Sequence, residues 1–163
     1  MELHNIPQKY FLLEGLIFVS KTEYEVTTVL GSCVSVCLWD PFLKVGGMNH
    51  YLLALWNGNG LATPRYGNIA IPKLIKKIMT FGCAKKNLRA KVFGGSNVLT
   101  VSNNGVKGAG WSNIMLAEEM LKEEGIPIVA SDLGGKYGRK IRFNTKNGVV
   151  MVKRFTTQLG KLP

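Results

Sequence analysis

Long apolar runs, cysteine and acidic residues are all scarce in this sequence. It has no stretch of about 18 apolar residues, which is the length that a membrane-spanning helix needs. Residues 1–9 lack the basic segment followed by an apolar run that is typical of a secretory signal. We therefore expect a soluble cytoplasmic protein without membrane insertion. Its length is typical of one domain, so we expect a single domain over residues 1–163.

The three cysteines, Cys33, Cys37 and Cys83, are too few for a disulfide framework. Cys33 and Cys37 fall within one expected strand, where four residues span roughly 13 Å, whereas a disulfide needs Cα atoms closer than about 7 Å. The CxxC and HxxxH spacings that are typical of zinc sites do not occur. We therefore predict no bound metal and no other cofactor.

Acidic residues are outnumbered, with 10 Asp and Glu against 21 Lys and Arg, which gives a net charge of +11. One explanation of this charge is a solvated basic surface. The alternative explanation is that the charge attracts an acidic partner. We find no aromatic RNA-binding motif and no helix-turn-helix pattern, so we do not expect a nucleic-acid ligand. Many basic residues lie in and just after one expected helix, whose outer face they can form: Lys73, Lys76, Lys77, Lys85, Lys86, Arg89 and Lys91.

Apolar patterning and turn signals predict strands interspersed with two main helices. Strands are expected at residues 26–30, 34–38, 45–53, 91–93 and 126–130, with a C-terminal hairpin of residues 140–143 and 148–154. The first helix is expected to carry Pro72 in its first turn and to end at Gly82. Ser112 or Asn113 can cap the second helix. These elements predict an α/β (α+β) layered sandwich with a mixed or antiparallel sheet.

One cysteine and one histidine lie in strands that we expect to form a hairpin. Asp40–Leu43 is taken as its four-residue loop, and in that register Trp39 faces Lys44. The same register places Cys33 opposite His50. Directly opposed residues have Cβ atoms about 4.5–5.5 Å apart on one face, which brings the thiol within reach of the imidazole. A slip of one residue would separate the two side chains onto opposite faces.

A cysteine beside a histidine is a pair that nucleophilic hydrolases use. A thiol with the ordinary pKa of about 8.5 is mostly protonated at neutral pH, and a neighbouring imidazole can take its proton to give a thiolate beside an imidazolium. Gly31 and Ser32 precede Cys33 and permit a tight turn that frees backbone N–H groups to stabilise an oxyanion. The alternative is that Cys33 is a small buried residue and His50 a structural one, and the pair alone leaves both readings open.

Several short segments along the chain carry recognisable motifs: LGSCVSVCLWDP (30–41), KVGGMNHYLL (44–53), FGGSN (93–97), GAGWSN (108–113) and SDLGGKYGRKIRFNTKNG (131–148). In order and spacing they resemble the chemoreceptor glutamine deamidase family, CheD. The resemblance covers roughly residues 26–153.

This resemblance implies an enzyme that hydrolyses particular glutamine side chains of methyl-accepting chemotaxis receptors to glutamate. It implies a Cys-His-Thr triad, with Cys33 as nucleophile, His50 as base and Thr27 as the residue that orients the histidine. Thr28 is the neighbouring candidate, and on a strand it would point to the other face. The resemblance also implies the phosphatase CheC as a partner, and a fold like the catalytic domain of toxin deamidases.

Two other classes of function stay open. A non-catalytic binding module would regulate CheC or a receptor by docking, and ammonia release lost in Cys33→Ala would distinguish an enzyme from it. Nucleic-acid binding rests on charge alone and predicts a steep salt dependence of binding to generic DNA. The glycine-rich segment Asp132–Arg139 lacks the Walker pattern of a phosphate-binding loop, so we interpret it as a structural loop near the site.

Overall fold

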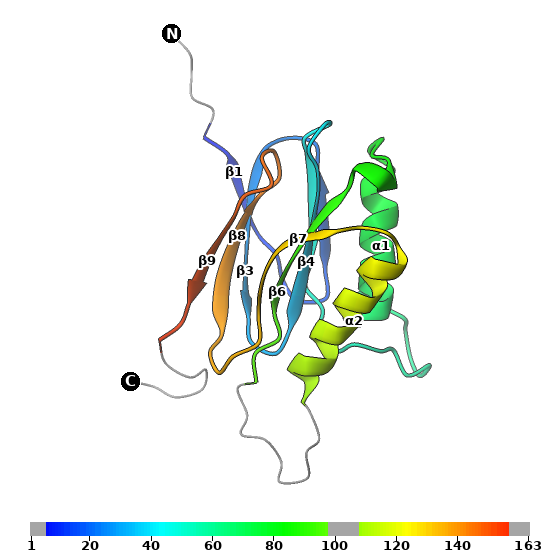
Figure 1. Ribbon diagram of the computed structural model, residues 1–163, viewed down its shortest axis with the longest axis vertical. Helices are drawn as coiled ribbons and strands as arrows, with labels where there is room; N and C mark the ends of the chain where they lie inside the picture. The colour runs from blue at the N-terminus through cyan, green and yellow to red at the C-terminus, as the bar shows by residue number, and fades with distance from the viewer. Residues whose placement is uncertain (1–5, 98–107, 157–163) are drawn as a thin grey trace.

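The computed structural model describes residues 6–97 and 108–156, which form three layers (Figure 1). Two β-sheets face each other, and two α-helices cover the outer side of one of them. The predicted layered sandwich with two main helices is therefore confirmed, with its strands divided between two sheets.

Both sheets are mixed. In the described residues one sheet has four strands, in the order β1 (Gln8–Phe11), β3 (Tyr24–Leu30), β8 (Arg139–Asn144) and β9 (Val150–Arg154). The other has five, in the order β2 (Ile17–Ser20), β5 (Val45–Asn49), β4 (Val34–Asp40), β6 (Arg89–Gly94) and β7 (Ile128–Leu133). The β1–β3 and β6–β7 pairs are parallel, and the other neighbouring strands are antiparallel.

Helix α1 (Gly67–Met79) is amphipathic, as its sequence predicted. Leu74, Ile75 and Ile78 are buried against the five-stranded sheet, and the basic residues of this helix face solvent. The helix begins before the expected start, so that Pro72 lies inside it instead of in its first turn. A short 3-10 helix, η1 (Lys85–Asn87), follows. No helix in the described part of the chain is long and apolar enough to cross a membrane.

Helix α2 (Ala109–Glu123) also begins earlier than expected, with Gly108 at its N-cap. Gly110 packs against the backbone of Gly95, where an added Cβ would lie 2.6 Å from the carbonyl oxygen. Ser112 and Asn113, the two candidates for the cap, both lie inside the helix, and Asn113 is fully buried. Its side chain is therefore free for contacts with neighbouring segments.

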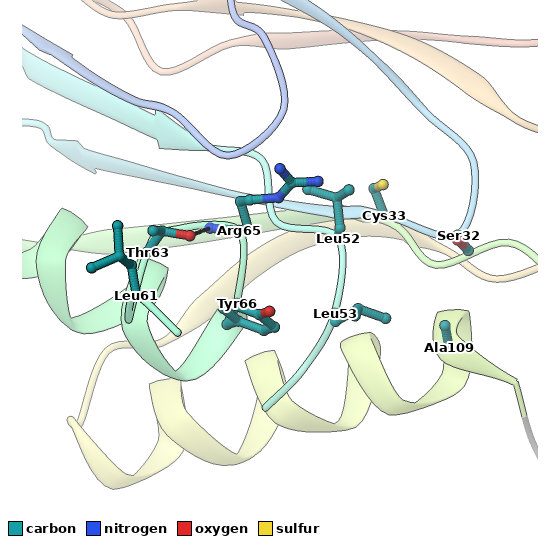
Figure 2. A pocket seen from close by; sticks show the side chains of 9 residues that line it. All are labelled: Ser32, Cys33, Leu52, Leu53, Leu61, Thr63, Arg65, Tyr66 and Ala109. Carbon is teal, nitrogen blue, oxygen red and sulfur yellow. Dashed lines mark hydrogen bonds between the residues drawn. The ribbon is translucent and has the colours of Figure 1, made fainter. Parts of the chain in front are cut away.

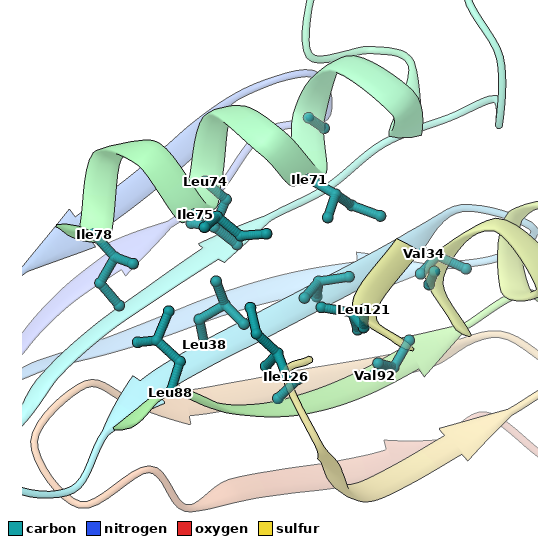
Figure 3. Packing of buried hydrophobic residues seen from close by; sticks show 14 of the residues in the cluster. Val34, Leu38, Ile71, Leu74, Ile75, Ile78, Leu88, Val92, Leu121 and Ile126 are labelled. Carbon is teal, nitrogen blue, oxygen red and sulfur yellow. The ribbon is translucent and has the colours of Figure 1, made fainter. Parts of the chain in front are cut away.

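Strand β4 lies between two apolar layers. Val34 and Leu38 point toward the helices, in the cluster that Figure 3 shows. Cys37 points the other way, into a second cluster between the sheets that includes Met48 of β5 and Leu30 of β3. Because both faces of β4 are buried, its sequence is an almost continuous run of apolar residues. This packing fixes the strand that directly follows Cys33.

Candidate active site

The β4–β5 hairpin forms, but its register differs from the expected one. Trp39 lies opposite Gly46 instead of Lys44. The expected loop began at Asp40, whereas this residue stays in β4 and its carboxylate accepts hydrogen bonds from two backbone N–H groups of the loop, at 2.8 and 3.1 Å. The register thus moves by an even number of residues, which leaves every side chain on its expected face.

The thiol and the imidazole come together although they are not directly opposed. Sγ of Cys33, a ring nitrogen of His50 and a carboxylate oxygen of Glu14 all lie within 4.8 Å of one another. Cys33 packs against the cluster between the sheets, to which Met48, two residues before His50, also belongs. The two side chains therefore meet at one end of the space between the sheets.

An interruption of the hairpin gives His50 its position. The backbone N–H of Val36 donates to the side-chain oxygen of Asn49 at 2.8 Å. Strand β5 ends at Asn49, and the chain pairs again through an isolated bridge between Val34 and Tyr51, with N–O distances of 3.1 and 3.0 Å. His50 lies between these two contacts and is 5% exposed.

Thr28 sets the tautomer of His50. Its Oγ1 lies 2.7 Å from Nδ1 of His50 and 2.8 Å from the carbonyl oxygen of Leu12. A hydroxyl has one hydrogen and a carbonyl can only accept, so Thr28 donates to Leu12 and accepts from Nδ1–H. The other ring nitrogen, Nε2, then carries a free lone pair, and within the described residues it is buried without a hydrogen-bond partner.

The resemblance implied Thr27 as the residue that orients the histidine, whereas in the structure the threonine that contacts the ring is Thr28. Val26, Thr28 and Leu30 share the face of β3 that points between the sheets, and all three are buried. Thr27 points to the opposite face and is partly exposed. The apolar residues at 26 and 30 were a signal in the sequence that position 28 lies on the inner face.

Burial determines the resting protonation of the pair. Desolvation raises the pKa of the Cys33 thiol, the charge of Glu14 raises it further, and the Cys33 backbone N–H partly lowers it. Desolvation lowers the pKa of His50, which the charge of Glu14 partly opposes. Near neutral pH the pair therefore rests as a thiol and a neutral imidazole. This differs from the thiolate and imidazolium pair that the sequence had suggested.

The other two cysteines do not have this environment. Cys37 is 1% exposed and Cys83 is 3% exposed, whereas Cys33 is partly accessible. Burial strongly raises the pKa of Cys37, and burial together with the nearby Asp40 raises the pKa of Cys83 to about 12. Neither thiol is suited to nucleophilic chemistry at neutral pH.

The FGGSN motif holds the backbone of the segment that carries Cys33. Gly95 N–H donates to the carbonyl of Cys33 and Ser96 N–H to that of Gly31, both at 2.9 Å. Gly94 has a φ of +110°, and a Cβ there would lie 2.2 Å from the carbonyl oxygen of Cys33. Glycine is thus required where β6 passes Cys33.

Asn113 joins the segment that carries Cys33 to the segment that follows His50. Its side-chain Nδ2 donates to the carbonyls of Ser32 and Leu52, both at 2.9 Å. The hydroxyl of Tyr51 in turn donates to the carbonyl of Asn113 at 2.6 Å. Sequence reasoning assigned Asn113 only to a helix cap, although it is part of the GAGWSN motif.

The glycine-rich segment Asp132–Arg139 supports this frame, in agreement with its interpretation as a structural loop near the site. Gly134 N–H donates to the carbonyl of Gly94 at 2.9 Å, and Asn97 N–H donates to the carbonyl of Gly135 at 2.8 Å. The guanidinium of Arg139 is buried and donates to carbonyls at both ends of the turn that begins with Asp132.

A pocket with a volume of about 520 Å³ opens beside Cys33 (Figure 2). Its lining is largely apolar and comes from the segment before β4, the segment after β5, the loop before α1 and the start of α2: Ser32, Cys33, Leu52, Leu53, Leu61, Thr63, Arg65, Tyr66 and Ala109. Figure 2 shows Cys33 near one end of the pocket, with Leu61 and Thr63 at the other. Cys33 therefore borders this pocket.

Comparison with known proteins identifies related chains. A family model described as "CheD chemotactic sensory transduction" matches residues 55–154. "Probable chemoreceptor glutamine deamidase CheD" of Trichlorobacter lovleyi is 52% identical over 147 residues, covering 90% of this chain and 91% of that protein. The protein of the same name from Sulfurimonas denitrificans is 46% identical over 146 residues, covering 90% and 94%.

Among solved structures, the "hypothetical protein YfiH" of Bacillus licheniformis matches with a TM-score of 0.42 and 17% identity, over 68% of this chain and 49% of that one. The curated relatives are far closer in sequence and match along nearly their whole length. On the strength of the family match and these relatives, the chain belongs to the CheD family.

Proposed function

We propose that this protein is a protein-glutamine glutaminase that converts specific glutamine side chains of methyl-accepting chemotaxis receptors to glutamate. The observation that carries the proposal is the Cys33 thiol beside a histidine whose Nε2 lone pair is free, at one end of a pocket. The names of the relatives describe deamidation of chemoreceptor glutamines.

The first half of the reaction forms a thioester. As Sγ of Cys33 attacks the carboxamide carbon, the S–H bond breaks and Nε2 of His50 takes the proton. The Nδ1–H bond to Thr28 keeps the ring in place while it becomes positively charged. His50 then gives the proton to the departing nitrogen, the C–N bond breaks and ammonia leaves. Backbone N–H groups of the Gly31–Cys33 turn are the proposed donors to the oxyanion.

The second half regenerates the thiol. A water molecule gives a proton to Nε2 of His50 as its oxygen attacks the thioester carbon. The C–S bond breaks, Cys33 recovers the proton from the imidazolium, and the product leaves as glutamate. The receptor gains one negative charge in each cycle.

The pocket suits a glutamine side chain carried on a helix. Its leucine walls can accept methylene groups and neighbouring apolar residues, while Arg65 and Thr63 supply polar groups. A carboxamide entering from this side meets Cys33 at the end of the pocket.

The proposed partners follow from the same assignment. Cytoplasmic receptor regions are expected to be acidic helical bundles, which complement the net charge of +11. The CheC phosphatase is the proposed regulatory partner, as the family resemblance implies. Such partners place the protein in the cytoplasm, and co-purification of tagged protein with CheC and receptor would test both contacts.

Mass spectrometry of a receptor cytoplasmic fragment after incubation tests the activity. We expect a gain of about one dalton at particular glutamines, the change that amide-to-acid conversion requires, together with ammonia. Cys33→Ala and His50→Gln should abolish both signals. Cys83→Ala is the matched control, because this thiol lies outside the site and should be dispensable.

A non-catalytic binding module predicts a different result. Wild type and Cys33→Ala would then bind a receptor fragment equally, and neither would release ammonia. That outcome would overturn the proposed function.

A further inference from the structure

Three side chains that offer different donor atoms meet at the end of the space between the sheets. Cys33 offers sulfur, His50 a ring nitrogen and Glu14 a carboxylate oxygen, all within 4.8 Å of one another. They come from the segment before β4, the residue after β5 and the turn between β1 and β2. Their wide separation in sequence explains why a search for CxxC or HxxxH spacing found no such cluster.

The histidine is already arranged as a metal ligand would be. Its Nε2 is buried, lacks a hydrogen-bond partner within the described residues and is left as the lone-pair atom by the contact of Nδ1 with Thr28. Histidines that bind metals usually donate their other ring N–H to an oxygen atom that fixes the ring. Here that oxygen is the Thr28 hydroxyl, which the carbonyl of Leu12 holds in turn.

The backbone also fixes the turn that carries Glu14. Gly15 N–H donates to the carbonyl of His50 at 2.7 Å, so the turn is tied directly to the histidine. Gly15 has a φ of +79°, and a Cβ there would lie 2.8 Å from Cγ of Arg65, so the turn packs against the pocket wall. The Glu14 side chain itself is exposed and can change rotamer.

We propose that Cys33, His50 and Glu14 form an inhibitory zinc-binding site. Sulfur, imidazole nitrogen and carboxylate oxygen are the donors that Zn²⁺ takes in proteins, and three protein ligands leave a fourth position for water. Zinc–ligand bonds of about 2.0–2.3 Å require the three donors to close up slightly from their present spacing. A rotamer change of the exposed Glu14 provides this movement.

The inhibition rests on the proposed function of Cys33 as the nucleophile. When Zn²⁺ binds, the S–H bond breaks, the proton passes to solvent and an S–Zn bond forms. No atom is oxidised or reduced. The sulfur lone pair is then held by the metal, and Nε2 of His50 no longer has a lone pair for the thiol proton. Removal of the ion by a chelator restores both groups.

Cobalt(II) is the probe of choice, because it replaces zinc in such sites and a thiolate ligand gives it a near-ultraviolet charge-transfer band. Titration of the wild-type protein with CoCl₂ should produce this band and visible bands of a tetrahedral ion, and added ZnCl₂ should remove them. This readout does not depend on any activity.

The decisive variant is Glu14→Gln, since this exposed position tolerates substitution. Loss of the carboxylate should weaken cobalt binding about 10-fold or more, a loss at least as large as outer-shell changes produce. Glu118→Gln, at an exposed position of α2, is the matched control and should bind as the wild type does. Thr28→Val should weaken binding by about 10- to 100-fold through loss of the outer contact, whereas Thr27→Val should not.

Iodoacetamide labelling of Cys33 links binding to the nucleophile. Saturating Zn²⁺ should slow labelling in the wild type, and a higher zinc concentration should be needed in Glu14→Gln. Absence of a thiolate–cobalt band, or equal cobalt affinity in wild type and Glu14→Gln, would overturn the metal site. Zinc binding that leaves deamidation of a receptor fragment unaffected would overturn the inhibition. Failure of the proposed function looks different, because the cobalt band would appear in a protein that never releases ammonia.

Discussion

At the residue scale, the single hydroxyl hydrogen of Thr28 determines which ring nitrogen of His50 keeps a free lone pair. Thr28 contacts both the carbonyl of Leu12 and Nδ1 of His50, and it can donate to only one of them. The carbonyl needs a donor, so the ring must supply the other hydrogen, and Nε2 is left as the base. In the proposed mechanism Thr28 is a positioning residue, because it acts on the thiol only through the histidine.

We expect Thr28→Val to lower kcat/KM for a glutamine peptide by about 10- to 100-fold, because a hydrogen bond to a charged group contributes about 1.5–3 kcal/mol. The bond to Thr28 matters most when His50 is an imidazolium, so kcat should account for most of the loss. Thr27→Val is the matched control and should change neither constant appreciably. An equal loss in both variants, measured by steady-state kinetics, would restore Thr27 as a candidate.

The pH profile tests the resting state of the pair. His50 must be neutral to accept a proton, and desolvation lowers its pKa from the ordinary value of 6.5. A lowered pKa keeps the neutral form to more acidic pH, so the acidic limb of kcat/KM should have its midpoint below 6.5. The measurement uses a short glutamine peptide, constant ionic strength and a chelator. A midpoint above 6.5 would instead mean that the Glu14 charge outweighs burial.

At the element scale, the site depends on how closely β6 and α2 approach the nucleophile segment. Gly94 and Gly95 let β6 pass along the carbonyl of Cys33. Asn113 reaches from the first part of α2 to the carbonyls of Ser32 and Leu52. The FGGSN and GAGWSN motifs thus build the frame of the site and contribute no reacting group.

Asn113→Ala should destabilise the fold by about 1–3 kcal/mol, the cost of leaving buried hydrogen-bonding groups without partners. It should also reduce kcat/KM of the folded protein, because Ser32 and Leu52 flank the two reacting residues. Urea unfolding and steady-state rates below the transition measure the two effects. Asn59→Ala, in an exposed loop, is the control for loss of an asparagine. Unchanged kinetics in a destabilised Asn113→Ala protein would limit Asn113 to a structural role.

At the scale of the whole molecule, the basic residues of α1 and the Cys33 thiol lie in different layers. The basic residues of α1 lie on its solvent face, in the outer helical layer, and the thiol lies at the end of the layer between the sheets. A net charge of +11 can steer the protein to an acidic receptor bundle without taking part in the reaction.

Raising the salt concentration should therefore slow deamidation of an intact receptor fragment more than that of a short neutral glutamine peptide. The Debye length falls from about 10 Å at 0.1 M to about 3 Å at 1 M, which removes long-range steering but leaves short-range chemistry intact. Each exposed ion pair contributes only about 0–1 kcal/mol, so no single lysine should be decisive. Steady-state rates on both substrates across a salt series provide the test, and parallel salt curves would assign the charge to solubility alone.

Local patterns in the sequence were sufficient for most of the elements and for singling out Cys33 and His50, which lie close together in the structure. Alternating and helical apolar spacings identified β3, β4, α1 and the C-terminal hairpin. Residues that share the buried face of a strand or helix lie only a few positions apart in the sequence, so the spacing of apolar residues reveals the element. The same patterns missed strands β1 and β2 and placed the start of both helices too late. Cys33 and His50 were found from their chemistry and from the motifs around them.

Tertiary structure decided the details on which the chemistry depends. The hairpin register changed because Asp40 caps its own turn, and Thr28 replaced Thr27 because β3 packs with that face toward the other sheet. Glu14 and Asn113 joined the site from segments far away along the chain. Sequence spacing determines which side chains share a face of one element, whereas the packing of distant elements determines which side chains meet.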